Sequence, residues 1–62
     1  MGTIRIRFVS GIEEDFEDSK RKGKNMMEEI KALLQQHYGH GFVEMLGNFI
    51  NAENIERISV IK

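Results

Sequence analysis

Two clusters of charged side chains near the N-terminus are the first candidates for chemistry. The stretch EEDFED at residues 13–18 holds five acids around one phenylalanine, and KRKGK at residues 20–24 follows it with four bases. Carboxylates work as acids or bases when their surroundings shift their pKa values, and a run of exposed acids predicts ordinary values. We therefore interpret the acidic stretch as a binding surface for a basic protein partner. Its predicted contact residues are Asp15, Phe16, Glu17 and Asp18, with the phenylalanine as the anchor.

Nucleophilic catalysis finds little support in the residue types present. The chain has no cysteine, which excludes thiol nucleophiles, thiolate zinc sites and disulfides. Ser10, Ser19 and Ser59 stand in no nucleophile motif. We therefore predict no catalytic residue, and a small enzyme with its site at a dimer interface remains a further alternative.

Three side chains in HYGHGFVE have the types of metal ligands. His37, His40 and Glu44 would share one face of an unbroken helix and could then hold zinc. Gly39 and Gly41 predict that the helix is broken within this stretch, so the three side chains would not share a face. We therefore predict no metal site and no cofactor.

The stretch TIRIRFV at residues 3–9 alternates apolar and polar side chains, which is typical of a strand. Its isoleucines share one side, so Arg5 and Arg7 lie on the other. Arginines on the solvent face of a strand help to prevent aggregation. Arginine is also a good bidentate reader of guanine in the DNA major groove. Both interpretations stay open at this point.

This strand, a short helix, a GKN turn and a second helix together resemble the order of elements in ribbon-helix-helix repressors, over residues 3–34. In that family, paired strands from two chains enter the major groove. The resemblance implies that alternate strand residues read bases, and that the basic turn before the second helix holds a phosphate. The residues in these roles would be Thr3, Arg5, Arg7, Lys22 and Lys24.

The elements expected to position these residues are two end strands with helices between them. Ser10 and Glu13 have the spacing of a Ser-x-x-Glu capping box, which predicts a short charged helix over residues 11–22, with a loop as the alternative. Residues 26–38 repeat apolar side chains at intervals of three and four, which predicts an amphipathic helix. Residues 41–51 also have helical spacing, although Gly47 weakens it. Residues 55–62 predict a second strand, so the expected fold is α+β with two to three helices.

The length of the chain limits its core. Sixty-two residues form at most one small domain, here residues 1–62, and a domain of this size buries little surface. Because disulfides are excluded and a two-stranded sheet is marginal alone, we predict that dimerisation completes the sheet. The predicted core residues are Ile4, Ile6, Phe8, Met27, Ile30, Leu33, Leu34, Phe42, Leu46, Phe49, Ile58 and Val60.

Charge and hydropathy narrow the function further. A net charge of −1 supplies no electrostatic footprint for nonspecific nucleic-acid binding. The apolar runs are too short for a membrane span and the N-terminus has no signal-like segment, so we expect a cytoplasmic protein without a membrane partner. The predicted function is a non-enzymatic regulatory or interaction protein that acts as a homodimer and binds a macromolecule, for instance by strand addition at an open edge. The alternative is a ribbon-helix-helix-like DNA-binding regulator.

Overall fold

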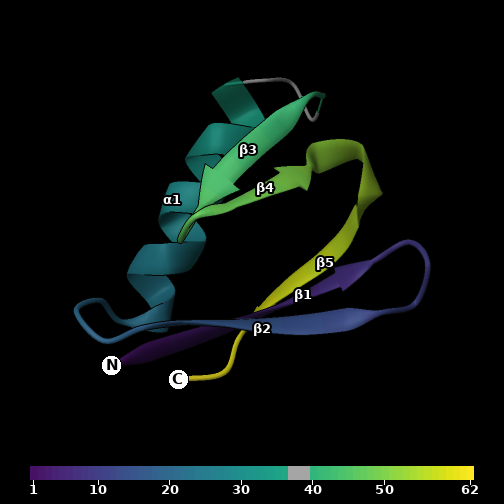
Figure 1. Ribbon diagram of the computed structural model, residues 1–62. Coiled ribbons are helices and arrows are strands. Elements are labelled where there is room, and N and C mark those ends of the chain that lie inside the picture. Colours follow the sequence, from purple (N-terminus) through teal and green to yellow (C-terminus); the bar gives the residue numbers. More distant parts are fainter. Residues whose placement is uncertain (37–39) are drawn as a thin grey trace.

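The computed structural model describes residues 1–36 and 40–62 and contains both strands and a helix (Figure 1). The elements are β1 (Gly2–Phe8), β2 (Glu13–Asp18), α1 (Gly23–Gln36), β3 (Phe42–Met45), β4 (Asn48–Asn51), the 3-10 turn η1 (Ala52–Asn54) and β5 (Ile55–Val60). The chain therefore has mixed α+β content, and within the described ranges strands outnumber helices.

The main sheet has three antiparallel strands in the order β2-β1-β5. Ile4 of the central strand β1 lies opposite Phe16 of β2 and Val60 of β5. Ile4 and its neighbour Ile6 on the same face are fully buried. The alternation in TIRIRFV thus has the predicted consequence, since its isoleucines form the centre of the core.

Helix α1 packs across the apolar face of this sheet and begins where the chain makes a close approach (Figure 1). The N–H of Gly23 donates to the carbonyl of Lys62 over 2.9 Å. A Cβ atom at Gly23 would collide with that carbonyl oxygen, so only glycine fits at this position. The helix therefore starts three residues before the predicted residue 26, and it directs Met26 and Ile30 into the core.

Strands β3 and β4 form a separate hairpin beside the C-terminal half of α1 (Figure 1). Val43 lies opposite Ile50, and both are buried with Met45. The hairpin turns at Leu46 and Gly47, whose φ values of 52° and 79° are both positive. Such values belong to the tight turns that match the twist of antiparallel strands.

The prediction of two to three helices is wrong, because two segments expected to be helical are strands. Residues 13–18 pair with β1, so the Ser-x-x-Glu pattern marks the turn before β2 and not a helix start. Residues 42–51 form the hairpin, in which side chains alternate with a period of two. The sheet also obtains its third strand from its own chain, so dimerisation is not needed to complete it.

Because these segments are strands, the observed core differs from the predicted one. Of the predicted core residues, Phe42 and Phe49 are exposed because strand alternation turns them outward. Leu46 is exposed in the hairpin turn, and Val60 is exposed at the sheet edge. Buried hydrophobic residues that the prediction lacked are Phe16, Met26, Val43, Met45, Ile50 and Ala52. The predicted helix end at His37 to Gly39 lies outside the described residues.

Candidate interaction site at the β5 edge

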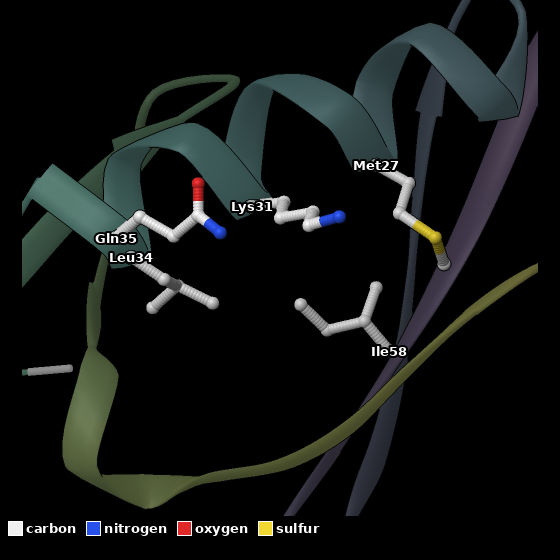
Figure 2. A pocket seen from close by; sticks show the side chains of 5 residues that line it. All are labelled: Met27, Lys31, Leu34, Gln35 and Ile58. Atoms are coloured by element: carbon white, nitrogen blue, oxygen red, sulfur yellow. The ribbon is translucent and has the colours of Figure 1, made fainter. Parts of the chain in front are cut away.

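An open apolar groove of about 540 Å³ lies between α1 and β5 (Figure 2). Met27 and Leu34 point from the helix toward the strand, and Ile58 points from β5 toward the helix. Lys31 and Gln35 complete the lining from the helix. The groove is therefore apolar at its floor, with one cation and one amide along the helical side.

The groove exists because the apolar surface of the helix is wider than the sheet beneath it. Met26 and Ile30 form a stripe that meets the central strand and is fully buried. Met27 and Leu34, which are seven residues apart, form a second apolar stripe on the helix. This stripe lies beside the first one, on the side of the helix that faces β5. Because β5 is the last strand of the sheet, this second stripe has Ile58 as its neighbour and then open space.

The outer edge of β5 is also open. Thr3 of β1 exchanges backbone hydrogen bonds with Ile61 and Lys62, so the odd-numbered residues of β1 bond toward β5. Ile58 and Val60 lie opposite the even-numbered residues of β1, and their N–H and C=O groups therefore point away from the sheet. Among the described residues no strand pairs with this edge. The groove and a row of free backbone groups thus lie side by side.

The opposite edge of the sheet carries the acidic stretch. Asp15 accepts two hydrogen bonds from the Arg5 guanidinium, at 2.8 Å from Nε and 3.2 Å from Nη2. This hydrogen bond lowers the pKa of Asp15. The pKa of Asp18 is also lowered, first by the backbone N–H of Lys20 at 2.8 Å and then by the Arg21 guanidinium at 2.7 Å. The expectation of ordinary pKa values is wrong for these two carboxyls, because both accept hydrogen bonds.

The predicted partner-binding residues are divided between the surface and the core. Phe16 is 8% exposed and packs against the core, so its side chain is not presented as an anchor. Asp15 and Glu17 are exposed, whereas Asp18 is half-buried and bonded locally. Binding of a basic partner through these acids stays a prediction.

The residues that the ribbon-helix-helix resemblance singled out do not form a two-chain ribbon here. Strand β1 is flanked on both sides by strands of its own chain, so its edges are occupied. Thr3 is buried, whereas Arg5 and Arg7 are half-exposed on the face away from α1. Arg7 Nε lies 3.6 Å from Glu56 Oε1, which is beyond hydrogen-bond distance. The structure therefore lacks the two-chain ribbon of that family. DNA reading by Arg5 and Arg7 stays a prediction.

The two lysines of the basic turn are exposed, and their backbone has a structural role. The carbonyl of Lys22 accepts hydrogen bonds from the N–H groups of Asn25 and Met26 at the start of α1. Lys24 follows within the first turn of the helix. Arg21 pairs with both Asp18 and Glu29, so charges within this region partly neutralise one another.

His37, His40 and Glu44 have the side-chain types of metal ligands. His37 lies outside the described residues, and His40 Nδ1 lies 2.7 Å from Glu53 Oε1. Within residues 1–36 and 40–62, no group of three or more ligand side chains could hold a metal ion.

Within residues 1–36 and 40–62, no helix is long and apolar enough to cross a bilayer.

The chain matches no protein-family model, no curated protein and no solved structure. The sequence pattern predicts Met27, Leu34 and Ile58 as core residues and does not single out Lys31 or Gln35 as site residues. The sequence does carry one signal of this groove, because the apolar stripe of residues 26–34 is too wide for a small sheet to cover.

Proposed function

We propose that this chain is a non-enzymatic protein-interaction domain that binds its partner at the β5 edge. The observation that carries the proposal is the apolar groove of about 540 Å³ beside a strand edge with unpaired backbone groups. Apolar floors with a few polar groups at the rim are typical of binding sites. The lack of cysteine is compatible with a reducing compartment, and we place the protein in the cytoplasm.

The proposed mechanism is strand addition. An extended segment of the partner pairs with the outward N–H and C=O groups of Ile58 and Val60. Alternate side chains of that segment point toward the helix side of the sheet, where one enters the groove between Met27 and Ile58. The backbone hydrogen bonds supply affinity, and the groove selects an apolar side chain. The ammonium of Lys31 stays hydrated at the rim of the groove.

Site-specific photo-cross-linking in cells tests this proposal. A photoreactive benzoylphenylalanine replaces Gln35 in the groove lining, and a matched control carries it at Glu17 on the opposite edge. We expect a discrete cross-linked protein product from position 35 and none from position 17. The product at position 35 should disappear in the Val60→Lys background, because Val60 is 43% exposed and tolerates lysine without disturbing the core. Equal products at both positions, or a product insensitive to Val60→Lys, would contradict the proposal.

A further inference from the structure

The β3–β4 hairpin exposes two aromatic rings on the face that points away from the core (Figure 1). Val43 and Ile50 lie opposite each other and are buried, so strand alternation turns their neighbours Phe42 and Phe49 outward. These two phenylalanines are 62% and 73% exposed. Scattered exposed apolar side chains need no explanation, but neighbouring ones are typical of interaction sites.

The register of the hairpin places both rings next to one carboxylate. Phe49 lies directly opposite Glu44, and Phe42 precedes Glu44 by two residues on the same face of the hairpin. Residues directly opposite each other have Cβ atoms about 5 Å apart, and diagonal neighbours such as Phe42 and Phe49 are about 7–8 Å apart. Phe42, Glu44 and Phe49 therefore form one exposed cluster, which we call the hairpin face.

The charge around the hairpin face is one-sided. Residues 32–56 hold three glutamates and neither lysine nor arginine, although the whole chain has a net charge of only −1. Glu53, beyond the end of β4, lies 2.7 Å from His40 Nδ1. Among the described residues no basic side chain comes within ion-pair distance of Glu44, which is exposed. The hairpin face is therefore complementary in charge to a cation.

An arginine guanidinium is the cation that fits these side chains best. Its planar face stacks on aromatic rings, and its edge carries N–H donors in a geometry that suits a carboxylate. Lysine has a compact, strongly hydrated ammonium and no planar group to stack. Nucleobases also stack on aromatic rings, but nucleic acid brings phosphates that the glutamates repel.

We propose that the hairpin face binds an arginine side chain in a basic segment of a partner protein. The guanidinium stacks on the exposed phenyl rings, and the Glu44 carboxylate accepts hydrogen bonds from its N–H groups. None of the three residues of the hairpin face lines the groove at the β5 edge. The hairpin face is therefore a second interaction surface, whose existence does not depend on the proposed function.

NMR titration of the isotope-labelled full-length chain tests the proposal. The probe is a short peptide of alternating arginine and glycine, and matched peptides replace every arginine with lysine or with glutamine. We expect the arginine peptide to cause saturable shifts of the backbone amide signals of residues 42–51. The lysine peptide should bind roughly threefold more weakly or worse, because it cannot stack, and the uncharged glutamine peptide should not bind.

Two variants separate the contribution of the rings from that of the charge. Phe49→Thr removes one ring, keeps a β-branched residue suited to a strand, and should weaken binding of the arginine peptide roughly threefold or more. Glu44→Gln keeps the side-chain size and should weaken binding by a similar factor, because the guanidinium loses its ionised acceptor. The matched controls are Ile12→Thr, which removes a side chain that is 60% exposed, and Glu28→Gln, which removes an exposed carboxylate from α1. Both controls should bind as the natural chain does, and circular dichroism should be unchanged in all four variants.

Several other outcomes would overturn the proposal. Shifts confined to β2, or equal binding by the natural chain and Phe49→Thr, would show charge attraction without stacking. Shifts of residues 42–51 with single-stranded oligothymidine but not with the arginine peptide would assign the rings to nucleobases. Self-association that Phe49→Thr abolishes, without peptide binding, would show that a second copy covers the hairpin face. Cross-linking from position 35 tests the β5 edge separately, so failure of one proposal is distinguishable from failure of the other.

Discussion

The two edge strands of the main sheet, β2 and β5, differ in the side chains that they expose. Strand β2 exposes carboxylates and is held to the core by one buried aromatic side chain, Phe16. Strand β5 exposes apolar side chains and leaves Ile58 half-buried beside an open groove. Both edges have free backbone groups within the described part of the chain, but only at β5 do those groups adjoin apolar surface. An open strand edge alone therefore does not make a binding site. The side chains beside the edge decide whether a partner can bind there.

The largest expected difference between the two edges is in folding stability. Phe16→Ala should lower the free energy of unfolding by about 3 kcal/mol or more, because it removes a buried aromatic ring and leaves a cavity. Val60→Ala should cost less than about 1 kcal/mol in a dilute sample, since the side chain is 43% exposed. Urea unfolding followed by circular dichroism measures both. Similar losses for the two variants would show that β5 is anchored as firmly as β2.

Removing the charge from β2 should make that edge associate. Glu13→Gln with Glu17→Gln keeps the Arg5–Asp15 pair and removes two exposed carboxylates from the outer face. We expect self-association and heat-induced aggregation to rise, because the repulsion between facing β2 strands falls. The charge-matched control is Glu28→Gln with Glu44→Gln, which lie on α1 and β3, away from the edges of the main sheet. Static light scattering during heating compares them, and equal aggregation would refute edge protection by these acids.

A smaller change at the β5 edge should strengthen binding there. Lys31→Met replaces the cation at the groove with an apolar side chain of similar length. Association through the groove should tighten several-fold, because more apolar surface is buried and one charge no longer needs to remain hydrated. Analytical ultracentrifugation of the variant beside Lys24→Met, a control outside the groove, measures this change. Weaker association of Lys31→Met would instead assign the ammonium a direct contact with the partner.

The smallest expected effect is an acid sensitivity located at β2. The pKa values of Asp15 and Asp18 are lowered in the folded chain, so these carboxyls bind protons less readily when folded than when unfolded. Their contribution to stability is present above the unfolded pKa of about 3.9 and is lost as the pH falls through the lower folded value. Urea unfolding between pH 6 and pH 2 should show this decline, and Asp18→Asn should show less of it. An unchanged slope in Asp18→Asn would assign the acid sensitivity to other groups.

The outcome of the sequence analysis differs between segments for a definite reason. TIRIRFV has one clear period, and its alternation predicted the buried face of β1. The segment at residues 42–50 carries apolar side chains that fit both a helix and a hairpin. The helical interpretation placed Phe42 and Phe49 in the core, whereas the hairpin buries Val43 and Ile50. EEDFED has too few apolar residues for either pattern to be visible, so its strand could not be inferred locally.

The sequence by itself determined the central strand, the amphipathic helix, the final strand and the absence of cysteine chemistry. These features depend on local periodicity or on composition, which one chain segment displays alone. Only the tertiary structure decided that EEDFED is a strand, because its pairing with Arg5 and Arg7 and the burial of Phe16 require β1 and α1. The groove is likewise a tertiary feature. It arises where a helix with a wide apolar surface passes beyond the last strand of a narrow sheet, and no single segment encodes that mismatch.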